Sequence, residues 1–138
     1  MTPELRLEAL AAADAEALES LADEILASGA AVSVTNGPES VSAPIRVPVP
    51  GADTTTVVLG HVALTRCTVV VAGTRGDGVR AGHDLTGAVA AAICDAECQR
   101  RGPLSDRVED LYRAARHASA ERGRDRARLV AATRLDES

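Results

Sequence analysis

Residues 57–72 read VVLGHVALTRCTVVVA, and this stretch decides the fold class. From residue 61 to residue 72 the side chains are mainly apolar and often β-branched, a composition typical of a β-strand. Alternate residues from 63 to 71 would share one face of this strand, and alternate residues from 62 to 70 would share the other. Both sets are mostly apolar, which predicts a central strand that is covered on both sides.

Shorter β-segments come before this strand. Residues 31–35 alternate apolar and polar side chains, and the Asn36-Gly37 pair that follows predicts a turn. Residues 45–49 alternate as well, but prolines flank and interrupt them. Because proline cannot donate a hydrogen bond to a sheet ladder, we expect residues 45–49 to form an edge strand or an extended segment.

The remaining β-structure lies on either side of the central strand. Residues 54–59 are rich in β-branched side chains and predict a strand, which follows a loop at 51–53 and is interrupted by Gly60. Residues 73–76, with the sequence GTRG, predict a hairpin connection, and residues 78–81 predict a short return strand.

Helices flank this β-region at both ends. Residues 3–28 carry apolar side chains at helical spacing and predict one helix with a break near Ala13, or two helices. Residues 84–101 predict a helix that starts at an aspartate cap, and residues 105–133 predict a last helix that starts at a serine cap. The order of elements predicts an α+β fold, in which an antiparallel meander of about four to five strands packs with N-terminal and C-terminal helices.

The composition limits how the core can be built. The 138 residues include no Trp, no Phe and a single tyrosine, Tyr112. We expect one domain over residues 1–138. Its core must come from Ala, Val, Leu and Ile, which each bury less surface than an aromatic ring. Either the fold is thin, or a partner completes it.

Several classes of protein are excluded by simple patterns. No apolar run reaches about 18 residues, so we expect no transmembrane helix, and the N-terminus has no signal-peptide pattern. A cytoplasmic location is the default expectation. The three cysteines form an odd number without framework spacing, which predicts reduced thiols.

The charge is distributed unevenly along the chain. Residues 1–99 hold 5 arginines and 13 acidic residues, a net charge of −8, whereas residues 100–138 hold 10 arginines and 7 acidic residues, a net charge of +3. The basic segment is either a solvated helix with internal ion pairs or a contact surface for phosphate or an acidic partner. The lack of stacking aromatic residues argues against a nucleic-acid partner.

Two motifs suggest ligand sites only weakly. The glycines at 73–82 follow a strand and precede a helix, but their spacing does not match a dinucleotide fingerprint, so a hairpin turn explains them better. Cys94 and Cys98 are four residues apart on one helical face, yet a tetrahedral metal site needs further ligands. We therefore predict no metal site.

Two residues on the central strand could carry chemistry. Cys67 with His61 or His83 is conceivable as a nucleophile and its base, although no spacing requires it. Arg66 interrupts an apolar stretch, and a guanidinium there needs an anionic partner. That partner is either a carboxylate of an ion pair or a bound anion such as a substrate.

The chain resembles one family along most of its length. Residues 57–69, VVLGHVALTRCTV, resemble the segment L-G-E-x-x-V-T-(R or E)-C-x-V of the G subunit of the carbon–phosphorus lyase core complex, PhnG. The glycine hairpin at 73–76, the GHD at 82–84 and the alanine-rich helix at 88–95 are similar to the same family. So is the closing segment LVAATRLD at 129–136.

This resemblance implies a non-autonomous subunit in organophosphonate catabolism. Its partners would be the nucleosidase subunit and other core subunits of a hetero-oligomer, which displaces adenine from ATP by a phosphonate to give a ribose 1-phosphonate 5-triphosphate. ATP, S-adenosylmethionine and the iron–sulfur cluster would bind only through partner subunits, so no cofactor is expected in this chain and no activity is expected of it alone. We expect Gly60, Thr65, Arg66 and Cys67 to contact substrate or a partner.

The chain departs from the family pattern at His61, at Asp77 and after Asp136, where the usual Phe is missing. Two alternative functions also remain open. One is a free-standing small binding or regulatory domain that uses the basic C-terminal helix. The other is a stand-alone hydrolase or transferase that uses Cys67 and a histidine.

Overall fold

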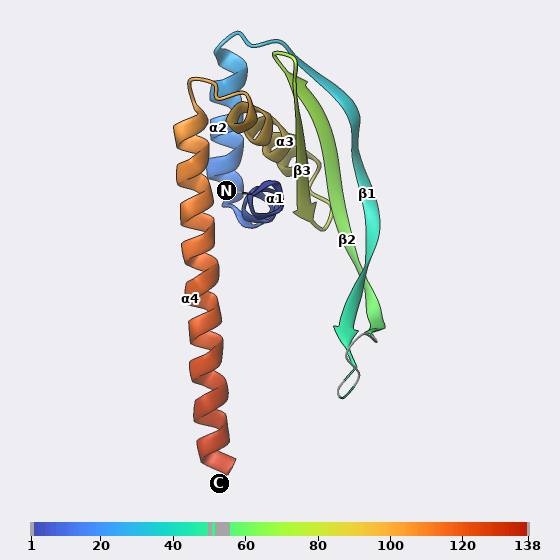
Figure 1. The fold of residues 1–138 in the computed structure, drawn as a ribbon, viewed down its shortest axis with the longest axis vertical. Coiled ribbons are helices and arrows are strands. Elements are labelled where there is room, and N and C mark those ends of the chain that lie inside the picture. The colour runs from blue at the N-terminus through green and yellow to red at the C-terminus, as the bar shows by residue number, and fades with distance from the viewer. Residues whose placement is uncertain (1, 50, 52–55, 138) are drawn as a thin grey trace.

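The computed structural model describes residues 2–49, 51 and 56–137 and has an α+β fold, as the sequence predicts (Figure 1). Residues 52–55, where a loop and the start of a strand are expected, lie outside the described residues. The elements in chain order are α1 (Pro3–Ala12), α2 (Ala15–Ala27), β1 (Val32–Pro48), β2 (Thr56–Val71), β3 (Thr74–Ala81), α3 (Leu85–Gln99) and α4 (Ser105–Glu137). No helix in this part of the chain combines the length and the apolar character that a membrane span requires.

The sheet has three main strands in the antiparallel order β1-β2-β3. The prediction of a turn at Asn36-Gly37 is wrong. Strand β1 continues through this pair and stays paired with β2, with shifts of register between Val34 and Glu39. Gly60 likewise pairs with Ile45 and does not interrupt β2. Because β1 and β2 pair along their whole length, the extra residues form bulges within the ladder, and the predicted short strands join into two long ones.

The hairpin between β2 and β3 is tighter than the sequence indicates. Val71 pairs with Thr74, and the two turn residues, Ala72 and Gly73, have φ angles of 47° and 86°. Two consecutive positive φ angles are typical of the type I′ turn of two-residue hairpins. The expected connection at 73–76 is therefore wrong, and the return strand begins at Thr74 and not at Gly78.

Among the described residues, helices pack over the centre of one face of the sheet. Helix α3 packs on β2 and β3 and covers the face that carries Thr65, Cys67, Val69 and Val71, all of which are buried. On the opposite face of β2, Arg66 is exposed and its neighbours two residues away are only half-buried. The expectation that β2 is covered on both sides is therefore wrong, because apolar alternation alone does not tell how many layers a fold has.

The core lies between the sheet, α3 and the other helices. The N-terminal segment forms two helices, which Thr2 and Asp14 cap by accepting hydrogen bonds from backbone amides. The largest fully buried apolar side chains come from every layer: Leu10, Leu18, Ile25, Val69, Val71, Val108 and Tyr112. The single aromatic ring thus lies where α4 meets the body.

Two extensions leave this body in the same direction (Figure 1). One is the C-terminal part of α4. The other, here called the arm, consists of residues 41–48 of β1 and 56–63 of β2. Strand β3 pairs with β2 only from Leu64 onward, so in the arm β1 and β2 have no third strand beside them among the described residues.

Candidate functional site

Thr65 and Cys67 lie on the covered face of β2, inside the protein. The Thr65 hydroxyl donates a hydrogen bond to the carbonyl of Gly82 at 2.6 Å and accepts one from the amide of Asp84 at 3.1 Å. Asp84 in turn caps α3 by accepting a hydrogen bond from the Gly87 amide at 2.9 Å. Thr65 therefore positions the loop that starts α3, because it is the side chain that ties this loop to β2.

Arg66 and Gly60 lie on the outside. Arg66 donates from Nε to Oε1 of Glu39 at 2.9 Å, across the β1–β2 ladder, and both side chains are exposed. The intramolecular ion pair that the sequence left open is thus present. Gly60 lies in the arm, and an added Cβ there would meet no atom within 4 Å. Arg66 and Cys67 line one small hollow of about 180 Å³ together with Thr68 and Asp77, whereas Gly60 and Thr65 lie elsewhere. Contacts of Arg66 and Gly60 with a partner stay a prediction.

The thiols differ in their surroundings. Cys67 and Cys94 are buried, whereas Cys98 is half-buried at the end of α3. Burial raises the pKa of Cys67 and raises the pKa of Cys94 to about 12, with nearby carboxylates adding to both shifts. No hydrogen bond between described residues joins Cys67 to a histidine; His83 is instead hydrogen-bonded through Nδ1 to the Ser40 hydroxyl at 2.8 Å.

Alkylation of the folded protein should therefore discriminate between the cysteines. With iodoacetamide at pH 8, Cys98 should react first, and Cys94 should stay unmodified because a pKa of about 12 leaves almost no thiolate. Peptide mass spectrometry before and after unfolding measures the order of labelling. Modification of Cys67 or Cys94 as fast as Cys98 in the folded state would contradict this, and such a result for Cys67 would favour the nucleophile hypothesis.

The cysteines and glycines considered for a metal or nucleotide site serve packing in the structure. Within the described ranges, no three His, Cys, Asp or Glu side chains lie close enough together to hold a metal ion. The Cys94 sulfur faces the core, 3.9 Å from the carbonyl oxygen of Leu18. Gly76 and Gly78 are in β3 under the backbone of α3, where the absence of a side chain allows close packing.

Three charged side chains among the described residues are buried although no sequence motif singles them out: Arg80, Asp95 and Glu97. Arg80 on β3 places Nη1 within 3.1 Å of the carbonyl oxygens of Leu10, Ala11 and Ala13 at the end of α1, and its Nε donates to Asp84 at 3.1 Å. A charged residue inside a short strand next to glycines was the available signal. It could not show which helix end this guanidinium would cap.

Asp95 on α3 forms the second buried polar cluster. It accepts hydrogen bonds from Nε of Arg6 at 2.7 Å, from the backbone amide of Asp77 at 2.9 Å and from Nε2 of Gln99 at 2.8 Å. This carboxylate thus joins α1, β3 and α3. Both clusters have their partners within the chain, so their evident role is to hold α1 against the body.

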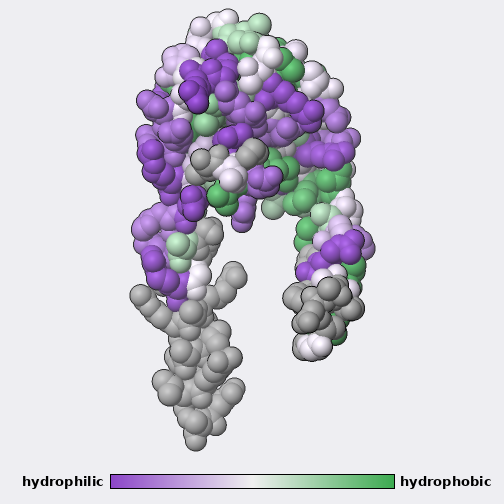
Figure 2. Space-filling view, in the orientation of Figure 1, coloured by the Kyte–Doolittle hydropathy of each residue, from purple (hydrophilic) through white to green (hydrophobic). Residues whose placement is uncertain are grey.

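The arm exposes apolar surface to solvent. Val57, Val58 and Val62 are 45%, 47% and 41% exposed, and Figure 2 shows apolar side chains along this extension. A two-stranded ribbon is only marginally stable in water by itself. Its outer edges also offer unpaired backbone groups to another strand. The arm is therefore the part of the molecule best suited to contact another protein.

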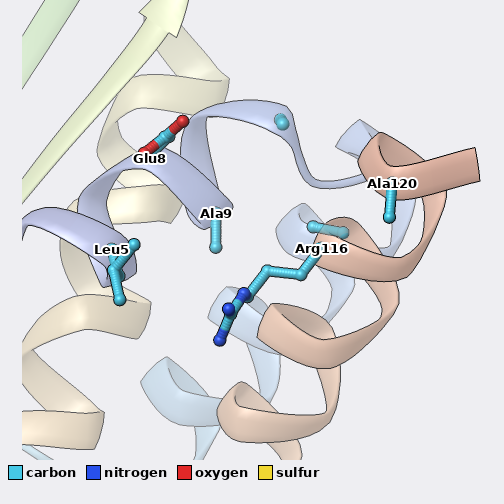
Figure 3. A pocket seen from close by; sticks show the side chains of 7 residues that line it. Leu5, Glu8, Ala9, Arg116 and Ala120 are labelled. Atoms are coloured by element: carbon cyan, nitrogen blue, oxygen red, sulfur yellow. The ribbon is translucent and has the colours of Figure 1, made fainter. Parts of the chain in front are cut away.

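Several hollows lie on the helical side of the body, and two of them are lined mainly by apolar or small side chains. One, of about 350 Å³, is an apolar groove between α2 and α3 next to Pro38, with Leu26 and Leu85 exposed at its border. The other, of about 250 Å³, lies between α1 and α4 and is lined largely by small side chains, with Leu5, Glu8 and Arg116 around it (Figure 3). Neither brings together a nucleophile and a base.

Comparison with known proteins agrees with the resemblance of the sequence. A family model described as phosphonate metabolism protein PhnG matches residues 4–137, nearly the whole chain. A search of individual curated proteins finds no match.

Proposed function

Because the chain belongs to the PhnG family of phosphonate metabolism proteins, we propose that it is a non-autonomous subunit of the carbon–phosphorus lyase core complex. In this proposal it binds the nucleosidase subunit and supports displacement of adenine from ATP by a phosphonate. The chain contributes a docking surface and no catalytic group of its own, and ATP, S-adenosylmethionine and the iron–sulfur cluster bind to other subunits.

The arm is the observation that carries this proposal. It combines three exposed valines with a ribbon that has no third strand among the described residues. Burial of such side chains against a partner stabilises a complex by about 25 cal/mol for each Å² of apolar surface removed from water. A partner would also supply the packing that a two-stranded ribbon lacks.

Introduction of negative charge on the arm should weaken assembly without unfolding the chain. In the variant Val58→Asp/Val62→Asp, two carboxylates would have to be desolvated in the interface, so we expect at least a tenfold loss of affinity for the nucleosidase subunit. Both side chains are exposed, so the core is unchanged. Co-expression followed by affinity purification and size-exclusion chromatography measures the complex.

Val34→Asp is the matched control. Val34 is 49% exposed and lies on the same strand pair, but opposite Val69, near the body, and outside the arm. We expect this variant to assemble like the unmodified chain. Equal loss of binding in both variants would refute a specific role of the arm, and a wild-type chain that never co-purifies with the nucleosidase subunit would refute the proposed function itself.

A free-standing binding domain is the alternative that this experiment tests. It predicts a stable chain that ignores the nucleosidase subunit and binds an acidic ligand through the Arg-rich C-terminal segment. Binding of that kind should weaken strongly when the salt concentration rises.

A further inference from the structure

A polar cavity of about 520 Å³ lies where α1, the end of α3 and the first turns of α4 meet. We call it the arginine cavity. It is lined by Arg6, Cys98, Gln99, Arg101, Glu109, Tyr112 and Arg113. Its size is within the range of small-molecule sites. Neither the proposed docking arm nor any predicted site residue lies in it.

The hydroxyl of Tyr112 makes no hydrogen bond with any residue that the structure describes, although the side chain is only 1% exposed. Burial raises the pKa of this phenol, and the charge and close approach of the Cys98 thiol, followed by the charge of Asp95, raise it further. The hydroxyl therefore stays protonated and can donate to an acceptor stronger than this weak thiol neighbour. A buried donor without an acceptor is costly. An acceptor atom from a ligand in the cavity would remove this cost.

Arg101 occupies a backbone position that normally belongs to glycine. Its φ angle is 54°, and the amides of Arg101 and Gly102 donate to the carbonyls of Cys98 and Glu97 at 3.2 and 3.0 Å. This pattern is the Schellman end of a helix, whose left-handed residue is usually glycine because a side chain is strained there. A long cationic side chain is thus held at the cavity despite a backbone cost.

The three cavity arginines are not equally engaged. Arg6 is tied to Asp95, and Arg113 forms exposed pairs with Asp110 at 2.7 Å and Glu109 at 3.7 Å, which are weak in water. No ion pair among the described residues includes Arg101. The cavity therefore offers one guanidinium without a carboxylate partner, a second that can be recruited, and a phenol donor.

We propose that the arginine cavity binds a small phosphate-type oxyanion, with Arg101 as its main charged contact and the Tyr112 hydroxyl as a further donor. A guanidinium fork matches both carboxylate and phosphate geometry. Two forks and a hydroxyl supply more donors than the two oxygens of a carboxylate use, whereas a phosphate accepts at three or more oxygens. The negative charge of Glu109 in the same lining repels the anion and weakens its binding.

Titration calorimetry of the full-length chain with inorganic phosphate tests this proposal, at low ionic strength and pH 8. Arg101→Gly should bind phosphate at least about tenfold more weakly, because a charge-assisted contact is lost. The same variant should melt about 2–4 °C higher, because glycine relieves the left-handed strain. Weaker binding together with higher stability distinguishes a ligand contact from a structural role.

Three further variants complete the test. Tyr112→Phe should weaken binding several-fold, Glu109→Gln should strengthen it several-fold, and the exposed Arg75→Gln, outside the cavity, should leave it unchanged. Acetate, a stand-in for the carboxylates of an acidic partner protein, should bind more weakly than phosphate. A wild-type chain that does not bind phosphate, equal binding by Arg101→Gly, or equal affinity for acetate would each overturn the proposal. No partner subunit is needed, so a failure to bind phosphate and a failure to bind the nucleosidase subunit are separate results.

Discussion

Replacement of Gly78 by alanine should lower the free energy of unfolding by about 3 kcal/mol, near the upper end of the usual cost of overpacking. Helix α3 lies so close to β3 that an added Cβ at Gly78 would collide with the carbonyl of Ala88 and the amide of Ala92, and would lie 2.8 Å from the Cβ of Ala91. Two of these atoms belong to the backbone of a buried helix. They cannot move aside like a flexible side chain, so the helix must shift from the sheet.

The adjacent glycine on the same face gives a second test of this contact. At Gly76 the added Cβ would meet Ala92 and would lie 2.5 Å from the amide nitrogen of Ala96. We expect Gly76→Ala to cost as much as Gly78→Ala. Chemical denaturation followed by circular dichroism measures both changes.

Gly60→Ala is the matched control for the two packing glycines. It also lies in a strand, its φ angle is not positive, and an added Cβ would meet nothing within 4 Å. Its effect should stay within about 0.5 kcal/mol. If Gly78→Ala were as harmless as Gly60→Ala, the close approach of α3 to β3 would be refuted.

Replacement of Arg80 by methionine should cost about 3 kcal/mol, because its guanidinium is the buried donor at the end of α1. Methionine keeps the apolar stem but removes the contacts to three carbonyl oxygens and the pair with Asp84. The melting temperature should fall by about 10 °C. Amide hydrogen exchange should rise first in residues 3–12, since α1 loses its attachment to β3.

Arg75→Met provides the comparison on the same strand. The Arg75 side chain is 72% exposed, and its pair with Asp77 spans 3.3 Å at the surface. Such pairs contribute little to stability, so the change should be below about 0.5 kcal/mol. An equal loss in both variants, or unchanged exchange in α1 of Arg80→Met, would show that Arg80 does not anchor this helix.

The fold class follows from local patterns, because each helix and strand can be recognised from its own residues. The period of apolar residues identifies the helices at both ends, and Asp84 caps α3 where the sequence predicts an aspartate cap. The β-branched run around Thr65 forms the central strand. Local patterns fail at the turns. Asn36-Gly37 favours a turn, yet β1 continues through this pair because it stays hydrogen-bonded to β2 on both sides.

The site residues were harder to predict for a different reason. Arg66 interrupts an apolar run and attracts attention, but its partner Glu39 lies on the neighbouring strand and satisfies it at the surface. Arg80 is marked only as a charged residue in a short strand and Tyr112 only as the single aromatic residue, and neither signal shows what the side chain contacts. Their importance comes from the end of α1 and from the cavity beside α3, both distant in sequence.

The sequence by itself therefore determined the element types, the buried stripes and the membership in a family, since each depends on short-range periodicity or on residue identity. Only the tertiary structure decided the lengths of the strands, the open face of the sheet, the projecting arm and the arginine cavity. These features depend on which segments pack together. That choice is made by backbone pairing and burial between residues far apart in the chain, which no local window contains.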